Sequence, residues 1–361
     1  MWGEGVKKGD ITVKQYLILL SVGLMPALVK LVPGRQAVYA GRGAWLGPLA
    51  ALGPVLVILW LMSTLGSALP EGGGLGEFYC LCLGERLGRL VCGISAVWLT
   101  AVSCFALRFC AERFVSTLYP DTDLGLFFLV LLAMVWWLSR RELAVTARAG
   151  QVFFYGIVAM LALILGLVLG KARLDLLWPV WVEDVPEVLR AGWDVLNAMS
   201  VGMGSLFLFS GVGGRRGGGS LVMRWASGLC AVHTLLSVAV LGTFGAQLAG
   251  RMQIPFFSLA KEVRPERLES IVAAAWVFAD VILLSILLRS AQRAFELAAG
   301  RELPGLSAAL ALLVLPGAYL AAGSSFALEE AFDSWERMGK NVVFLGLPLM
   351  AAGVGRLRRV V

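Results

Sequence analysis

The feature that most constrains this chain is a series of long apolar windows separated by short polar connections. A helix needs roughly 20 mostly apolar residues to cross the hydrocarbon core of a bilayer. Since 59% of the residues are hydrophobic and only 15% are charged, the chain lacks the polar surface of a soluble domain. The sequence therefore predicts an all-α polytopic membrane protein. Ten windows qualify as spans: 12–33, 44–69, 89–117, 123–139, 142–170, 188–210, 220–243, 269–290, 304–321 and 338–356.

The basic residues indicate how these spans are oriented. They concentrate in the connections that lie inside if the N-terminus is cytoplasmic, among them Arg140, Arg141 and Arg358. Cytoplasmic connections of membrane proteins carry such an excess of Lys and Arg, so we expect both termini to lie inside. The net charge of +7 then reflects the excess of basic residues in the cytoplasmic connections and does not indicate nucleic-acid binding.

The ten spans divide into two halves of five within one transmembrane domain, 1–361. The first half covers 12–170 and the second covers 188–356. The first span of each half is interrupted by residues that weaken a helix. Proline removes a backbone hydrogen bond at a cost of about 3 kcal/mol, and each glycine adds about 1 kcal/mol. These residues are Gly23, Leu24, Met25 and Pro26, with Pro33 further on, and Ser200, Val201, Gly202, Met203 and Gly204.

Matching interruptions predict a five-plus-five inverted repeat whose helices 1 and 6 are broken near the middle of the membrane. Free N–H and C=O groups at such breaks would suit the carboxylate and ammonium of an amino-acid-like ligand. Asp194 and Asn197 adjoin one break, and apolar side chains would form a wall. The predicted ligand residues are Gly23, Leu24, Met25, Pro26, Phe105, Asp194, Asn197, Ser200, Val201, Gly202, Met203, Gly204 and Phe207. The alternative is that the glycines only allow helices to pack closely.

Charged residues inside the predicted spans need partners, because an unpaired ion costs at least about 2.5–3.5 kcal/mol there. Arg108 is expected at a depth that lets it meet Asp194 or Asp280, and Glu112 follows it by four residues on the same helix face. Arg113 is expected to reach the membrane surface. Two interpretations stay open. Arg108, Glu112 and Asp280 form a buried ion network that either fixes the helices or borders the ligand site.

The remaining chemistry-bearing residues give little support for an enzyme. His233 is the single histidine, and the cysteines contain no CxxC pair, so neither a metal site nor a cofactor is expected. Free thiols are the better interpretation than a disulfide framework. These cysteines are Cys80, Cys82, Cys92, Cys104, Cys110 and Cys230.

Two connections are long enough to form short helices. The first contains LGEFYCLCLGERLG, which predicts an interfacial cytoplasmic helix with Phe78, Tyr79 and Leu83 toward lipid. The second, 255–268 (PFFSLAKEVRPERL), is expected outside, where a helical hairpin of mixed charge would cover the mouth of a cavity.

Four segments resemble the spore germination permease-like family, the B subunits of nutrient germinant receptors within the amino acid/polyamine/organocation transporter superfamily. VPGRQAVYAGRGAWLGPLAAL (32–52) is similar to the passage between its first two spans, and LPEGGGLGEFYCLCLGERLGRLV (69–91) to the following loop. RELAVTAR (141–148) and ERLESIVAAAWVFADV (266–281) resemble its entries to spans five and eight.

The resemblance implies a leucine-transporter-like fold in the spore inner membrane, beside an A-type membrane subunit and a C-type lipoprotein subunit. It implies a subunit that senses a nutrient germinant, commonly an amino acid, at unwound parts of helices 1 and 6. A proton-coupled amino acid or amine transporter is the alternative function. A membrane scaffold with a vestigial site is a third possibility.

Overall fold

The computed structural model describes residues 11–31, 33–66, 72–117, 121–214, 218–252, 254–262, 268–321 and 339–358. The α-helices are α1 Val13–Leu31, α2 Gly34–Ala40, α3 Gly47–Gly66, α4 Leu75–Leu83, α5 Glu85–Thr117, α6 Leu124–Ser139, α7 Leu143–Leu169, α8 Val185–Gly204, α9 Gly219–Ala249, α10 Pro255–Lys261, α11 Leu268–Ala299, α12 Leu306–Leu320 and α14 Leu347–Leu357. The 3-10 helices are η1 Gly41–Leu46, η2 Leu174–Leu176, η3 Val182–Asp184 and η4 Ser205–Gly211, and η5 Asn341–Gly346 is a π-helix. The described strands are β1 Ile11–Thr12 and β2 Val212–Gly213.

The apolar windows have become helices, as a backbone in hydrocarbon requires, because a helix satisfies its own N–H and C=O groups. Five stretches are long and apolar enough to cross a membrane: Gly34–Trp60, Glu85–Val115, Leu143–Leu169, Gly219–Ala249 and Ile271–Ala299. Shorter apolar helices are Val13–Val29, Leu124–Ser139, Leu306–Leu320 and Asn341–Leu357. The helical membrane protein is therefore evident in the described residues, whereas the count of ten spans and the inverted repeat stay predictions.

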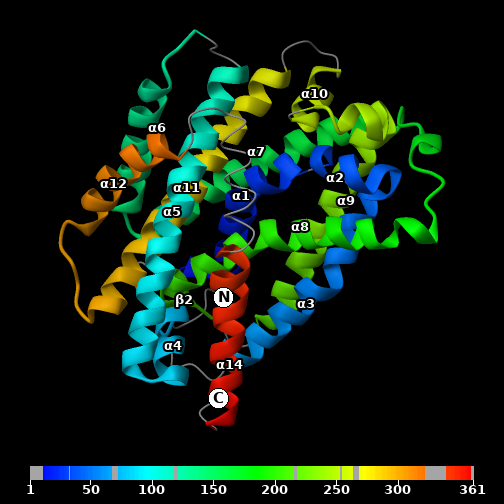
Figure 1. Cartoon of the computed structure of the whole chain (residues 1–361). Coiled ribbons are helices and arrows are strands. Elements are labelled where there is room, and N and C mark those ends of the chain that lie inside the picture. The colour runs from blue at the N-terminus through cyan, green and yellow to red at the C-terminus, as the bar shows by residue number, and fades with distance from the viewer. Residues whose placement is uncertain are drawn as a thin grey trace, which may run out of the picture.

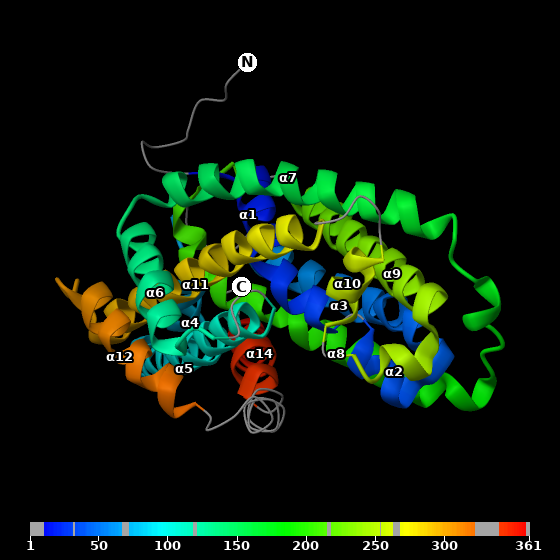
Figure 2. The ribbon, with the colours of Figure 1, turned by 90° about the horizontal axis from the view of Figure 1, so that it is seen from above.

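The two longest helices form the centre of the arrangement. α5 has 33 residues and α11 has 32, and they make the most extensive contact between any two described elements (Figure 1). Seen from above, α11 and α1 lie in the interior, while α7 runs along one edge and α6 and α12 lie at one end (Figure 2). The core is correspondingly built on α1, α5 and α11, with a second cluster of apolar side chains around α9, α10 and the start of α11.

The first helices of the two predicted halves, α1 and α8, pack against each other in opposite directions. Ile11 pairs with Val212 in the short parallel β1–β2 ladder, and the Tyr16 and Ser205 hydroxyls share a hydrogen bond of 2.5 Å. Further along, a Cβ at Gly202 would lie 3.5 Å from the Leu24 side chain. The two segments in which the sequence predicts breaks therefore lie next to each other.

The prediction that both helices are broken at these segments is wrong. α1 continues through Gly23–Pro26, with Pro26 inside the helix, and α8 continues through Ser200–Gly204. The helices are interrupted only after these segments, further along the chain. α1 ends at Leu31 before Pro33 and α2, and α8 tightens into the 3-10 helix η4 at Ser205.

Close packing is the physical reason that the glycines are present. A Cβ at Gly23 would lie 3.3 Å from Ile286 on α11, and one at Gly204 would lie 2.7 Å from Leu99 on α5. Both glycines therefore allow neighbouring helices to approach, which is the common role of small residues between membrane helices. A single proline is tolerated within such a helix, since neighbouring elements stabilise the kinked turn.

The short helix predicted in LGEFYCLCLGERLG is present as α4, but the surroundings of its apolar residues differ from the prediction. Phe78, Tyr79 and Leu83 are buried in the protein, with Tyr79 0% exposed, and do not face lipid. They pack because α4 contacts α5, η4 and α14, so its apolar face is covered by protein.

Candidate functional site

A small pocket lies where α10 closes over the contact between α5 and α11. Its volume is ≈ 10 Å³, about the space that one water molecule needs. The first part of the predicted hairpin 255–268 is present as α10, which lines this pocket, whereas 263–267 lie outside the described residues. The lining residues are Cys110, Arg113 and Phe114 from α5, Ile254 and Phe257 from α10 and the residue before it, and Ala273, Trp276, Val277 and Asp280 from α11.

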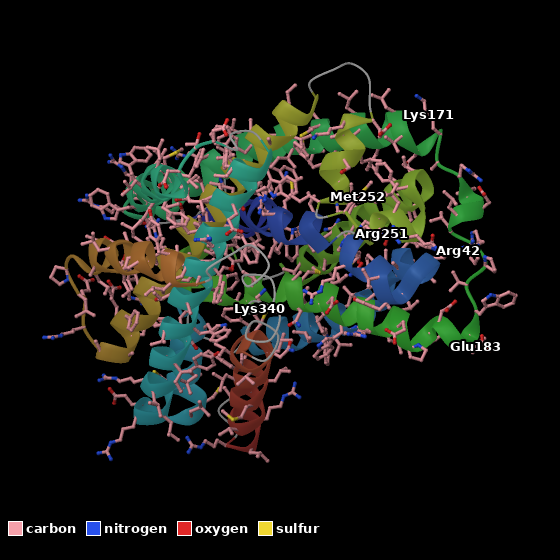
Figure 3. All side chains as sticks on the ribbon, turned by 45° about the horizontal axis from the view of Figure 1, so that its top comes forward. Arg42, Lys171, Glu183, Arg251, Met252 and Lys340 are labelled. Carbon is pink, nitrogen blue, oxygen red and sulfur yellow. The ribbon has the colours of Figure 1, made fainter. Side chains whose placement is uncertain are left out.

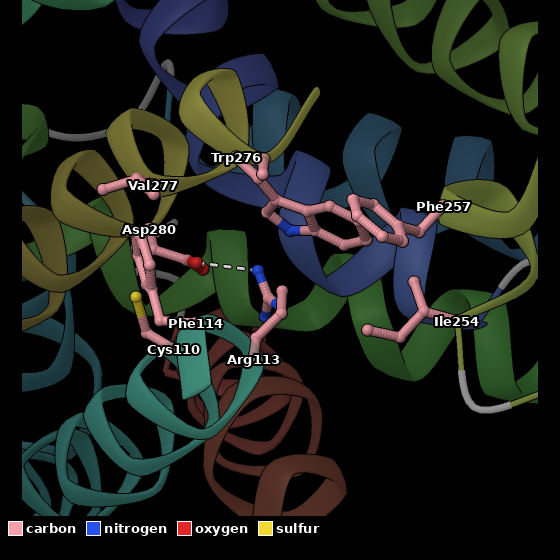
Figure 4. A pocket seen from close by; sticks show the side chains of 9 residues that line it. Cys110, Arg113, Phe114, Ile254, Phe257, Trp276, Val277 and Asp280 are labelled. Atoms are coloured by element: carbon pink, nitrogen blue, oxygen red, sulfur yellow. Dashed lines mark hydrogen bonds and ion pairs between the residues drawn. The ribbon is translucent and has the colours of Figure 1, made fainter. Parts of the chain in front are cut away.

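An ion pair between α5 and α11 is the main polar feature of this pocket (Figure 4). Arg113 donates from Nη1 to Oδ2 of Asp280 at 2.7 Å, and the two side chains are only 14% and 7% exposed. The Arg113 guanidinium also lies 4.4 Å from the centre of the Trp276 ring, within the range of a cation–π contact. Opposite charges and an aromatic face therefore meet in one apolar enclosure.

This pairing corrects the predicted ion network. Arg108 does pair with Glu112, at 2.6 Å, but Asp280 pairs with Arg113. Five residues separate the two arginines, so their side chains leave α5 roughly 140° apart. Arg108 faces Phe128 on α6, with its guanidinium 5.9 Å from the ring centre, whereas Arg113 faces α11.

The expectation that Arg113 reaches the membrane surface is thus wrong. Arg113 lies four residues from the end of its apolar window, and this position favoured a surface role. Its long side chain points inward because Asp280 and Trp276 offer a charge and an aromatic ring there. No signal in a single sequence distinguishes the two directions.

Asp194 lies in a different place, between α8 and α2. It accepts a hydrogen bond from the Tyr39 hydroxyl at 2.5 Å, and Arg190 stacks over the Tyr39 ring with its guanidinium 4.5 Å from the ring centre. One turn earlier, Gln36 donates to the carbonyl of Ala191 at 3.1 Å. Two hydrogen bonds thus attach α2 to α8, and the expected contact of Asp194 with Arg108 does not form.

The other predicted ligand residues are not gathered around one cavity. Met203 and Val201 are buried, and Leu24, 1% exposed, occupies the space beside Gly202. Asn197 is buried, and its side-chain oxygen has no hydrogen-bond partner among the described residues. Phe207 of η4 packs against Tyr79 of α4, with ring centres 6.2 Å apart, whereas Asp194 of α8 contacts Tyr39 of α2. Phe105 is half-buried on α5. These residues stay predicted ligand contacts.

Two glycines of α8 test whether this region is bare backbone or packed helix. We expect Gly204→Ala to destabilise the protein by about 1–3 kcal/mol, because its Cβ would meet Leu99 at 2.7 Å and Phe344 at 3.0 Å. Gly202→Ala should be neutral or slightly stabilising, since its nearest neighbour would lie at 3.5 Å. Thermal unfolding of the purified variants measures both effects. Equal stabilities of the two variants would show that Leu99 and Phe344 can make room for a methyl group at Gly204 without loss of stability.

The helices and the buried polar sites describe a polytopic membrane protein with two ion pairs, Arg108–Glu112 and Arg113–Asp280, buried among the described helices. This chain belongs to the spore germination protein family, whose sequence model matches residues 10–298. It is similar to spore germination protein KB of Bacillus subtilis (strain 168), with 21% identity over 268 residues, which cover 72% of this chain and 70% of the relative.

Solved structures give a looser likeness. The crystal structure of a mutant manganese transporter from Eremococcus coleocola matches with a TM-score of 0.45 and 16% identity, covering 97% of this chain and 79% of that one. The crystal structure of a second mutant of the same transporter gives a TM-score of 0.34 and 17% identity, covering 93% and 77%. Overlaps as loose as these carry nothing about substrate, and the fold rests on the helices described above.

Proposed function

We propose that this chain is a nutrient-sensing subunit of a spore germination receptor, and that it recognises a small amino acid at the pocket between α5, α10 and α11. The family membership supports the receptor role. The Arg113–Asp280 ion pair beside Trp276 is the observation that carries the ligand class. This proposal places the ligand site in the pocket under α10, whereas the sequence predicted it between α1 and α8.

The pocket has the groups that a free amino acid needs. Arg113 can bind a carboxylate with two parallel hydrogen bonds, and Asp280 can accept from an ammonium group. A zwitterion entering between them replaces one ion pair by two, so neither buried charge loses its partner. Ile254 and Phe257 from the α10 region, with Phe114 and Val277, supply apolar contacts for a side chain. Amines and carboxylic acids carry only one of the two charges, so they would pair with Asp280 or with Arg113 but not with both.

Ligand entry requires the pocket to widen. Sites for small molecules usually measure roughly 300–1,000 Å³, far above the ≈ 10 Å³ found here. α10 has seven residues and packs on α1, α9 and α11 without belonging to the long helices. Its outward movement would open the pocket, and a bound ligand would hold it in a new position. This movement is the proposed signal to the partner subunits.

The proposed orientation places this pocket on the outer side of the membrane. The charged side chains Arg42, Lys171 and Glu183 are spread along the same side of the molecule in Figure 3, and we assign this side to the outside. Both termini then lie inside, in the spore inner membrane, next to an A-type membrane subunit and a C-type lipoprotein. Ten spans in two inverted halves complete the proposal.

A thermal-shift screen of the purified chain with the standard L-amino acids tests the ligand class. We expect at least one amino acid to raise the melting temperature, while its decarboxylated amine and its deaminated acid do not. Trp276→Leu should weaken binding roughly 2–30-fold, because Arg113 loses the ring that holds it over the pocket. Trp137→Leu, at an exposed site on α6, is the matched control.

The same preparation separates sensing from transport. In proteoliposomes that contain this chain alone, a sensor binds the amino acid saturably without accumulating it. Uphill accumulation that an uncoupler abolishes would replace the sensor by a proton-coupled transporter. Binding that is unaffected by Trp276→Leu would overturn the assignment of the pocket.

A further inference from the structure

A pair of thiols lies in the contact between α4 and α5. The two helices are joined at Gly84, whose φ of 87° allows the chain to reverse, and they approach closely enough that a Cβ at Gly88 would lie 2.5 Å from the Cys80 Cα. Cys92 follows Gly88 by one turn of α5. Its Cα is therefore expected about one helical turn, roughly 5–6 Å, from the level of Cys80.

The side chains of Cys80 and Cys92 meet in this contact. The two thiols lie close enough to interact, and Cys92 Sγ donates to the carbonyl of Gly76 at 3.8 Å. Gly76 and Cys80 are one turn apart on α4, so Cys92 lies against both. All six cysteines are free, and Cys80 and Cys92 are the two whose thiols interact among these described residues.

We propose that Cys80 and Cys92 form an oxidisable dithiol, a site that reacts with low-molecular-weight disulfides. The half-exposed Cys80 attacks first as a thiolate and forms a mixed disulfide, releasing one small thiol. Cys92, 0% exposed and already in contact, then displaces the second small thiol. The small disulfide is reduced to two thiols, the protein loses two hydrogens, and a Cys80–Cys92 bond forms.

The surroundings of Cys80 make the rate of this thiol–disulfide exchange depend on pH. Burial raises the pKa of the Cys80 thiol, and the nearby Arg89 opposes this shift. Because only the thiolate attacks, the exchange should accelerate as the pH rises toward that pKa.

The effect of a Cys80–Cys92 disulfide on the protein depends on the elements that α4 contacts. Glu77 of α4 pairs with Arg293 of α11 at 2.7 Å, and Arg358 after α14 donates to the Cys82 carbonyl at 3.3 Å. Gly76 lies beneath the Phe207 ring of η4. A disulfide would fix α4 to α5, and α4 also contacts α11, α14 and η4. The oxidation state of the two thiols would therefore set how far this end of the bundle can move. This proposal does not depend on the identity of the ligand.

Oxidation of the purified full chain with glutathione disulfide, followed by alkylation and peptide mass mapping, tests the dithiol. We expect a Cys80–Cys92 cross-link that is lighter by two hydrogens, a higher melting temperature, and reversal of both by a reducing dithiol. Cys92→Ser should stop at a glutathione adduct on Cys80. Cys82→Ser, on the same helix, should still form the cross-link.

Other results would overturn the proposal. These are wild-type protein in which Cys80 and Cys92 stay reduced, and glutathione that remains on Cys80 although Cys92 is present. A cross-link that forms equally in Cys80→Ser would show that a different thiol partner is involved.

Discussion

Replacement of Asp280 by alanine is expected to destabilise the protein by about 3–5 kcal/mol, because Arg113 keeps its charge in a buried site after losing the carboxylate that pairs with it. Arg113 is only 14% exposed, and its guanidinium lies against Trp276 where water has little access. The energy lost is mainly the cost of keeping the Arg113 charge buried without the Asp280 carboxylate, and it exceeds the net value of the pair. Thermal or denaturant unfolding in detergent measures the loss.

The double variant Asp280→Asn with Arg113→Gln separates folding from ligand recognition. Both charges are removed, so the buried amides can hydrogen-bond to each other, and we expect most of the stability to return. Amino acid binding should stay lost, because no charge remains for the ligand carboxylate or ammonium. A double variant that regains both stability and binding would assign the pair a structural role alone. Glu112→Gln, in the neighbouring pair with Arg108, should leave ligand affinity unchanged.

The second large effect is expected at Gly88 in the α4–α5 contact. Gly88→Ala should destabilise the protein by about 1–3 kcal/mol or more, because the added Cβ would lie 2.5 Å from the Cys80 Cα and 2.6 Å from its nitrogen. A backbone cannot rotate aside as a side chain can, so the two helices must separate.

A matched glycine lies on the same helix. Gly93→Ala places its Cβ 3.7 Å from Ala298, an ordinary van der Waals distance, and should be neutral or stabilising by up to about 1 kcal/mol. Unfolding temperatures of the two variants, measured side by side, check the difference. The Gly88→Ala variant should also lose the Cys80–Cys92 cross-link. If Gly88→Ala is as stable as Gly93→Ala, the close approach of α4 and α5 is not required for folding.

Local sequence patterns predicted the helices well because each helix satisfies its own backbone and needs only a continuous apolar composition. The same reasoning placed short helices at α4 and α10. It also paired Arg108 with Glu112, since residues four apart on one helix are neighbours whatever surrounds them.

The faces of these helices were harder to predict. Phe78 and Tyr79 of α4 are apolar enough for lipid and for a protein core alike, so only the neighbours η4 and α14 decided that they are buried. The glycines at Gly23 and Gly204 have the same ambiguity. A glycine that weakens a helix and a glycine that lets another helix approach look identical in one sequence, and here packing decided.

By itself, the sequence determined that this chain is a helical membrane protein with charges buried in its apolar segments. Composition and local periodicity act through the backbone's need for hydrogen bonds in hydrocarbon, and this need does not depend on the fold. Only the tertiary structure decided which charges meet. The partner of Asp280 depends on the direction in which α5 turns its side chains toward α11, so Arg113 and not Arg108 completes the pair beneath α10.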